Sequence, residues 1–244
     1  MTRIGILSDV HANLEALDSV LADIEQQRCD LLVCLGDFVG YGPDPIECVA
    51  RLRGRLRTAV AGNHDRAAVG GRPIDDFNLF AQEAIVWTQA HLDAATRDYL
   101  SGLPERDEVE GALLVHGSPL RPVDEYIGDA KTARASFVAH PFRIAFVGHT
   151  HVPAMFEEVG HRVRLAEWLP GIPKPLRSDH RYIINVGSVG QPRDSNRDAA
   201  YVTFDVAEPS VTLHRVPYDI LATQRKMEAA MLPVPLRERL ALGR

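Results

Sequence analysis

Cysteine is scarce in this sequence. The 244 residues contain Cys29, Cys34 and Cys48, and no two of them form a C-x-x-C pair. This odd, widely spaced set argues against a disulfide framework and against a thiolate zinc site. We therefore expect the three cysteines to behave as small, buried apolar side chains of a protein in a reducing compartment.

Long apolar runs and an excess of positive charge are also missing. The first apolar run stops at Ser8 and Asp9, too early for a signal-peptide core or a membrane span. Lysine and arginine number 27 against 33 acidic residues, a net charge of -6. This balance argues against a broad surface for long nucleic acids or anionic membranes. We expect a cytoplasmic protein with no membrane partner.

What is present is typical of a globular domain, with 45% hydrophobic and 25% charged residues. The length fits one large domain, which we place at residues 1–218. Residues 219–244 are expected to form a C-terminal tail of one or two amphipathic helices, packed on the domain or on a partner. A homo-oligomer is left open.

The first third of the chain predicts a β-α-β pattern. Apolar runs at 3–8, 31–35 and 58–60 predict strands, and residues 14–24 and 43–52 predict helices between them. Parallel strands joined in this way bring their carboxyl ends to one edge of a sheet, where α/β proteins place ligand sites. The polar residues that follow each strand should therefore meet.

The rest of the chain has a different pattern of apolar residues. Residues 74–101 predict a helical stretch lying across the first sheet, and residues 131–138 predict a further helix. The proline-rich segment 167–180 predicts a loop. Short apolar runs predict a second, mixed sheet packed on the first, with strands at 105–109, 112–116, 143–147, 154–159, 181–186, 200–206 and 210–216.

Polar clusters follow the predicted strands, and they hold five of the ten histidines. In order they are SDVHA, GDFVGYG, GNHDR, VHGS and VGHTHV. Carboxylates, imidazoles and an amide oxygen gathered at one edge suit manganese, iron or zinc rather than calcium. A carboxylate among them can bridge two ions, and such a pair is suited to displacement at phosphorus.

The order D-x-H, G-D, G-N-H-D, H-G and G-H-T-H resembles the calcineurin-like metallophosphoesterase superfamily. The segment NVGSVGQPRD at 185–194 resembles its compact bacterial and archaeal phosphodiesterase branch. The resemblance implies an α/β fold with four layers, in which two mixed sheets lie between helices. It also implies two divalent or trivalent transition-metal ions, with manganese favoured over iron, zinc, nickel or cobalt.

The resemblance also implies roles for individual residues. One metal ion would be held by Asp9, His11 and His151, and the other by Asn63, His116 and His149. Asp37 would bridge the two ions. His64 would contact the phosphate and protonate the leaving oxygen, a task suited to histidine near neutral pH.

One departure from the family pattern is informative. Protein phosphatases of this superfamily carry GDxVDRG after the second strand, whereas this chain has GDFVGYG. Gly40 and Tyr41 thus replace an aspartate and a phosphate-binding arginine. Arg66 and Arg193 are candidate substitutes for substrate binding. Asp65 is expected to order its loop.

We also expect residues beyond the ligand set to support it. Asn185, Gly187 and Ser188 follow a predicted strand, and hydrogen bonds from them would order the histidine-rich edge.

The leading hypothesis is a binuclear phosphodiesterase that uses a metal-bridging hydroxide as nucleophile and acts on a small phosphate ester or nucleotide. The alternatives are a phosphomonoesterase or protein phosphatase, and a dinucleoside polyphosphate hydrolase. A catalytically silent protein that keeps the fold as a scaffold is the non-enzyme alternative. The sequence fixes neither the substrate nor the metal.

Overall fold

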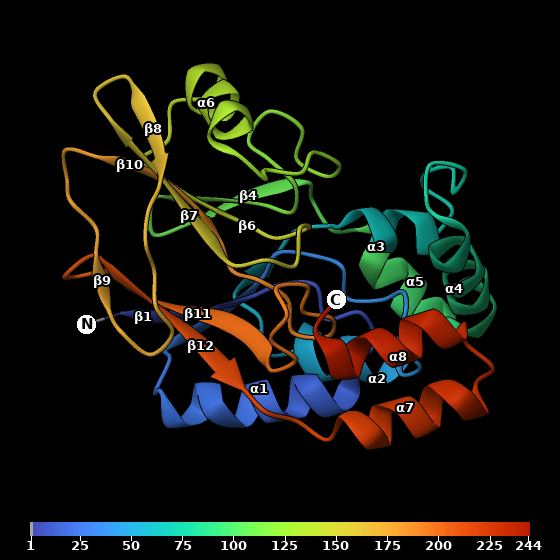
Figure 1. The fold of residues 1–244 in the computed structure, drawn as a ribbon. Helices are drawn as coiled ribbons and strands as arrows, with labels where there is room; N and C mark the ends of the chain where they lie inside the picture. Colours follow the sequence, from blue (N-terminus) through green and yellow to red (C-terminus); the bar gives the residue numbers. More distant parts are fainter. Residues whose placement is uncertain (1) are drawn as a thin grey trace.

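Two β-sheets form the centre of the fold, and helices cover both outer faces (Figure 1). The structure is a computed structural model and describes residues 2–244. Each sheet has six strands and contains both parallel and antiparallel neighbours. The α/β four-layer architecture expected for the chain is confirmed.

The first sheet has the strand order β3-β2-β1-β11-β12-β9. Strands β1 to β3 run parallel, whereas β11, β12 and β9 each pair antiparallel with the preceding neighbour in that order. Their bounds are β1 Arg3–Leu7, β2 Leu31–Cys34, β3 Thr58–Ala59, β9 Lys174–Pro175, β11 Ala199–Asp205 and β12 Ser210–Val216.

The second sheet has the order β4-β5-β6-β10-β7-β8. Strands β5, β6 and β10 are parallel, and the others pair antiparallel. Their bounds are β4 Arg106–Val109, β5 Ala112–Val115, β6 Ile144–Val147, β7 Ala154–Val159, β8 Arg162–Leu165 and β10 Arg181–Asn185.

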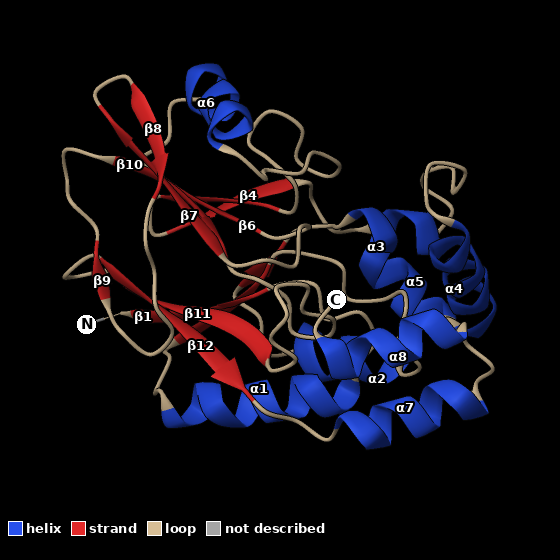
Figure 2. Cartoon of the chain, viewed as in Figure 1, coloured by secondary structure: helices blue, strands red, loops and turns tan. Residues whose placement is uncertain are grey.

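The helices fall into groups around the two sheets (Figure 2). Helices α1 and α2 lie outside the first sheet and α6 lies outside the second, while α3, α4, α5, α7 and α8 gather at one end of the molecule. Their bounds are α1 Leu14–Gln26, α2 Pro45–Arg53, α3 Asn63–Ala68, α4 Leu79–His91, α5 Ala94–Ser101, α6 Ala130–Ala139, α7 Ile220–Ala229 and α8 Val234–Leu242. Among residues 2–244, no helix combines the length and apolarity needed to cross a bilayer.

Three apolar layers hold these elements together. Ile4 and Ile6 of β1 meet Phe146 of β6 in the core between the sheets. Leu17 of α1 belongs to the core on the outer face of the first sheet, and Phe137 of α6 belongs to that of the second. Burial of such side chains contributes about 1.5–3 kcal/mol each, enough to fix the sheet edges that carry the polar clusters.

Three sequence expectations need correction. Residues 199–216 form β11 and β12 of the first sheet, not of the second, because β11 pairs with the distant β1. Residues 74–101 contain two helices, separated where Asp93 caps α5. Helix α4 packs against α7 and α8 through a small apolar cluster instead of crossing the first sheet. The 167–180 loop contains the short strand β9.

Candidate metal centre

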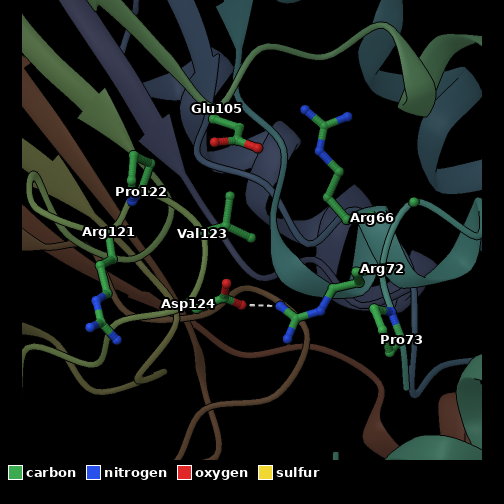
Figure 3. A pocket seen from close by; sticks show the side chains of 9 residues that line it. Arg66, Arg72, Pro73, Glu105, Arg121, Pro122, Val123 and Asp124 are labelled. Atoms are coloured by element: carbon green, nitrogen blue, oxygen red, sulfur yellow. Dashed lines mark hydrogen bonds and ion pairs between the residues drawn. The ribbon is translucent and has the colours of Figure 1, made fainter. Parts of the chain in front are cut away.

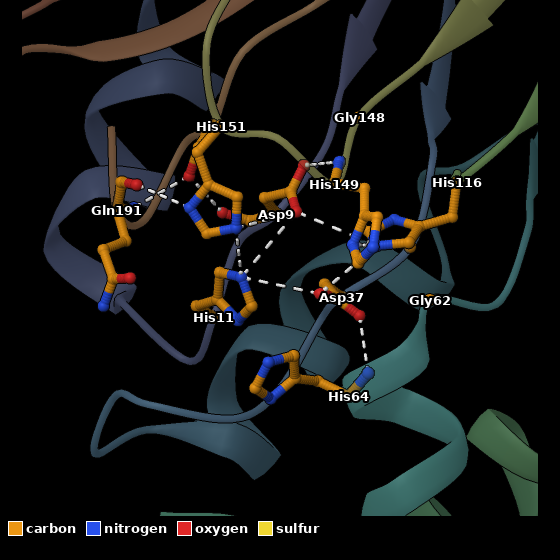
Figure 4. Close-up of polar contacts among 12 residues, drawn as sticks. Asp9, His11, Asp37, Gly62, His64, His116, Gly148, His149, His151 and Gln191 are labelled. Carbon is orange, nitrogen blue, oxygen red and sulfur yellow. Dashed lines mark hydrogen bonds and ion pairs between the residues drawn. The ribbon is translucent and has the colours of Figure 1, made fainter. Parts of the chain in front are cut away.

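The polar clusters do meet at one place. The segments that follow β1, β2, β3, β5 and β6 converge at one edge of the two sheets, and their side chains point toward one another (Figure 4). The predicted ligand residues that converge there are all buried: Asp9, His11, Asp37, Asn63, His116, His149 and His151. The structure thus brings together every residue that the sequence placed in the ligand set.

Two groups of potential ligand atoms can be distinguished, each with its atoms within 4.8 Å of one another. One group contains Asp9, His11, Asp37 and His151, and the other contains Asp37, His116 and His149. Asp37 belongs to both. The Asn63 side-chain oxygen extends the second group, since it lies 3.2 Å from His116 Nε2.

The tautomers of the four histidines follow from their outer hydrogen bonds. One ring nitrogen of each faces a backbone carbonyl oxygen, which can only accept, so that nitrogen carries the proton. The carbonyls belong to Val39 for His11 at 3.2 Å, Leu35 for His116 at 2.8 Å, Asp124 for His149 at 3.1 Å and Gln191 for His151 at 2.6 Å. The inner nitrogens therefore present lone pairs to the centre, the arrangement typical of metal-ligating histidines.

The inner atoms face one another at short distances. His11 Nε2 and His151 Nε2 are 3.1 Å apart, and His116 Nε2 and His149 Nδ1 are 3.2 Å apart. Among the described residues, Asp9 Oδ1 and Asp37 Oδ2 are buried and have no hydrogen-bond donor. Lone pairs and carboxylates facing one another in a buried site repel unless positive charge joins them. The donor set therefore fits two borderline cations.

The electrostatics of the centre favour positive charge. Burial opposes ionisation of Asp9 and Asp37, yet the neighbouring histidines hold the pKa of both carboxyls well below the usual range. Burial also disfavours the imidazolium of His116, but Asp37 and Asp9 outweigh it and raise its pKa to about 9. Burial lowers the pKa of His149 to about 3 and that of His151 to about 4. A proton on His116 is therefore the main competitor of a cation.

The predicted ligand residues have an unusual backbone conformation. Asp9, His11, Asp37, His149 and His151 all have a φ between 50° and 66°, in the left-handed region. Such residues cost of order 1 kcal/mol each, and they persist where the surroundings hold them. In a strand, His149 and His151 would point to the same face. Because the chain leaves strand geometry at Gly148, the two side chains instead join different groups of potential ligand atoms.

Hydrogen bonds and close packing hold this backbone in place. The Asp65 carboxylate accepts from the N–H groups of Asp37 at 2.8 Å, Phe38 at 2.8 Å and Gly62 at 3.0 Å. A Cβ on Gly62 would overlap Asp37, which explains the glycine. Asp65 thus orders its loop, as expected.

The segment after β10 orders the histidine-rich edge from the other side. The Asn185 amide donates to the carbonyl of Gly148 at 2.5 Å, and the Ser188 hydroxyl donates to the carbonyl of Asp9 at 2.8 Å. The Gly187 N–H donates to the Asn185 side-chain oxygen at 2.9 Å, which fixes the amide. These contacts confirm the supporting role expected for this segment.

A cavity of about 410 Å³ opens beside the centre. Asn63, His64 and His149 line it, and so do Arg193 and Arg72. Aromatic side chains complete its wall, and sequence analysis did not single them out for substrate contact: Tyr41, Phe77 and Tyr126. Tyr126 stacks on His149 with ring centroids 3.8 Å apart, a contact between loops that no local pattern reveals.

His64 lies between the centre and this cavity. Its backbone N–H donates to Asp37 Oδ1 at 2.9 Å, and its ring contacts Tyr41 and Phe77. Its Nδ1 atom has no hydrogen-bond partner among the described residues. Burial holds the pKa of His64 well below its usual value, and Asp37 only partly offsets this. The imidazole is therefore neutral at pH 7.

The two arginines predicted for substrate binding lie in different places. Arg193 is on the cavity wall beside Tyr41, with its guanidinium 5.6 Å from the ring centroid. Arg66 instead donates to the carbonyls of Ser101 at 3.3 Å and Leu103 at 2.8 Å.

Arg66 lines a neighbouring cavity, and its guanidinium points away from that of Arg121 (Figure 3). Arg72 and Asp124, which form an ion pair, line both this cavity and the one that His64 lines. Of the two predicted arginines, only Arg193 shares a cavity with His64.

Comparisons with known proteins agree with this geometry. A family model described as a calcineurin-like phosphoesterase superfamily domain matches residues 2–208. The uncharacterized protein MJ0912 of Methanocaldococcus jannaschii is 36% identical, over 100% of this chain and 99% of its own. The crystal structure of a metallophosphoesterase from Sphaerobacter thermophilus is 44% identical with a TM-score of 0.90, covering 100% and 99% of the two chains. Hypothetical protein PH1004 of Pyrococcus horikoshii shares the fold at 20% identity with a TM-score of 0.81, covering 100% and 99%.

Proposed function

Since the chain belongs to the calcineurin-like phosphoesterase superfamily, we propose that it hydrolyses phosphodiesters at a centre of two transition-metal ions. The observation that carries the proposal is the set of four histidines, each with one ring nitrogen held by a carbonyl and the other turned toward Asp9 and Asp37. A scaffold that binds no metal has no need of this arrangement.

The proposed ligand assignment follows the two groups of atoms. Asp9, His11 and His151 would hold one ion, and Asn63, His116 and His149 would hold the other. Asp37 would contact both ions, because it belongs to both groups. Nitrogen and oxygen donors of this kind suit manganese, with iron, zinc, nickel and cobalt as alternatives. When bound, such a pair neutralises phosphoryl oxygens and supplies a nucleophile from water near neutral pH.

The chain's own residues would bind the phosphate and assist the leaving group. His64 lines the cavity directly beside the ligand Asn63, within reach of a phosphate at the centre. A phosphate's negative charge would favour protonation of the buried, neutral imidazole. His64 would then donate a proton to the leaving oxygen. Arg193, on the same wall, would contact non-bridging oxygens.

The loop after β2 favours a diester over a phosphoprotein substrate. A Cβ on Gly40 would lie 3.0 Å from Cγ of His64 and closer still to Nδ1, so this backbone has no room for an aspartate partner of that ring. Tyr41, Phe77 and Tyr126 form the aromatic part of the cavity wall, and they suit planar or apolar groups attached to the phosphate. Cyclic nucleotides, short dinucleotides and small aryl diesters have this character.

A substrate panel with manganese tests the proposal. We expect turnover of model diesters, cyclic nucleotides or short dinucleotides to exceed that of matched monoesters and of dinucleoside polyphosphates. Asp37→Asn serves as the inactive control, so that a contaminating phosphatase is recognised. If only monoesters are hydrolysed, the protein is a phosphomonoesterase and the diester assignment is wrong. A protein that binds metal but hydrolyses none of the panel would favour the catalytically silent scaffold.

A further inference from the structure

Two arginines near the cavity share one neutral oxygen. The Gln191 side-chain oxygen accepts from Arg193 Nη2 at 2.8 Å and from Arg239 Nη1 at 3.2 Å. Gln191 is 1% exposed, so this oxygen is shielded from water. Within residues 2–244, the ion pairs found do not include one from either guanidinium to a carboxylate.

This pairing is unfavourable by itself. Two like charges are drawn together on an amide oxygen that carries only a partial negative charge, in a chain where acidic residues outnumber basic ones by 33 to 27. The half-buried Arg66 has two carbonyl oxygens to itself, whereas here two guanidinium groups share one neutral oxygen. Holding two like charges together without a matching negative charge is costly. An anion from outside the chain would therefore be attracted to the two guanidinium groups.

The pair is fixed to the metal centre. The Gln191 carbonyl accepts from His151 Nδ1 at 2.6 Å, and the Arg193 N–H donates to the His151 carbonyl at 3.2 Å. Arg193 also lines the cavity of His64. An anion held by this arginine would thus lie on the cavity side of the centre.

Arg239 comes from a part of the chain that the family match does not reach. It lies on α8, whereas the match ends at residue 208. Leu236 and Leu240 of α8 are buried against Tyr41, and the Gly243 carbonyl accepts from the Ser195 N–H at 2.9 Å. The C-terminal helix is thereby locked onto the segment that carries Gln191 and Arg193.

We propose that Arg193 and Arg239, joined by Gln191, form a phosphate-binding pair, in which Arg193 contacts the phosphate oxygens and Arg239 positions it and adds positive charge. The pair supplies the positive charge that protein phosphatases of the superfamily have in the arginine at the position of Tyr41. This inference rests on the proposed function for its substrate, since the anion is taken to be the phosphate group of the ester. Its test needs no turnover.

The test measures binding of inorganic phosphate to protein freed of metal with a chelator, by calorimetry at low salt. We expect Arg239→Gln to weaken phosphate binding about tenfold, because a neighbouring positive charge and the positioning of Arg193 are both lost. Arg239→Lys should restore part of the affinity. Arg237→Gln is the matched control, because Arg237 lies on the same helix and pairs with Glu228 at 2.8 Å.

The Gln191→Glu variant distinguishes an effect on phosphate binding from an effect on stability. The substitution keeps the shape of the side chain and gives both arginines the carboxylate they lack. We expect an unchanged or higher melting temperature together with phosphate binding weakened at least as much as in Arg239→Gln. In the metal-loaded enzyme, Arg239→Gln should raise KM for a diester more than it lowers kcat.

Two results would contradict the proposal that Arg193 and Arg239 bind phosphate as a pair. If Arg239→Gln lowers the melting temperature but leaves phosphate affinity unchanged, Arg239 only anchors α8. If Gln191→Glu binds phosphate as wild type does, the two arginines do not attract it. If phosphate binding behaves as expected while no ester is hydrolysed, the pair stands and the proposed diester hydrolysis fails.

Discussion

The Nε2 atoms of His11 and His151 face each other at 3.1 Å, although each ring has already committed its N–H to a backbone carbonyl. Asp9 Oδ1 lies 3.2 Å from the same atom of His151. Three electron-rich atoms held this close in a buried place define a receptor for a cation.

Metal binding should release a proton. The pKa of His116 is raised to about 9 by Asp37 and Asp9, against burial, so at pH 7 its ring is protonated. A metal ion needs the lone pair on that ring, and the proton must leave. We expect metal affinity to rise with pH between about 6 and 9. Calorimetry in buffers of different ionisation enthalpy measures the protons released per site, and a value of zero would contradict this account.

Asp37→Asn should empty both metal positions together, since Asp37 belongs to both groups of ligand atoms. We expect metal binding weaker by at least about 100-fold, more than is typical for a residue that only supports a ligand. Elemental analysis after dialysis measures the occupancy. Asp75→Asn is the control, because Asp75 is exposed and outside both groups. Loss of one ion alone would show that Asp37 does not bridge.

His64→Ala should keep both ions yet lose most turnover. The loss should be about 10²–10⁴-fold on an alkyl diester, whose leaving oxygen needs a proton. It should be much smaller on a nitrophenyl diester, whose leaving group departs as an anion. Comparison of kcat for the two substrates decides the role. Equal losses on both would assign His64 to phosphate binding instead of proton donation.

Asp65→Ala should destabilise the fold, although Asp65 belongs to neither ligand group. Its carboxylate is fully buried and accepts hydrogen bonds from the backbone N–H groups of Asp37, Phe38 and Gly62. Leaving these donors unmatched should lower the free energy of unfolding by about 3 kcal/mol. Urea denaturation measures this value, with Asp75→Ala as the exposed control. A change below 0.5 kcal/mol, as is typical of surface positions, would show that water replaces the carboxylate.

The sequence predicts that these side chains meet, because each follows a strand and parallel strands bring their ends together. Their roles as metal ligands remain a prediction. The sequence does not reveal that β11 belongs to the first sheet, since the pairing of β11 with β1 joins residues about two hundred positions apart. Strand β8, Arg162–Leu165, was not predicted. It has only 4 residues and is largely exposed, so the alternation of its arginines with Val163 and Leu165 is too short to stand out.

The cavity wall was harder to predict than the centre. Tyr126 and Arg72 reach the cavity from loops between elements, where no periodicity places a side chain. Arg239 lies on α8, whose burial against Tyr41 depends on the whole tail folding back. The domain boundary at residue 218 remains a prediction, and so does the cytoplasmic location.

The central claim, that this centre holds two metal ions joined by Asp37, is tested most directly by an anomalous difference map from crystals grown with manganese. The account predicts two separate peaks with Asp37 between them, one beside Asp9, His11 and His151 and one beside Asn63, His116 and His149. A single peak, or none at full manganese saturation, would contradict it.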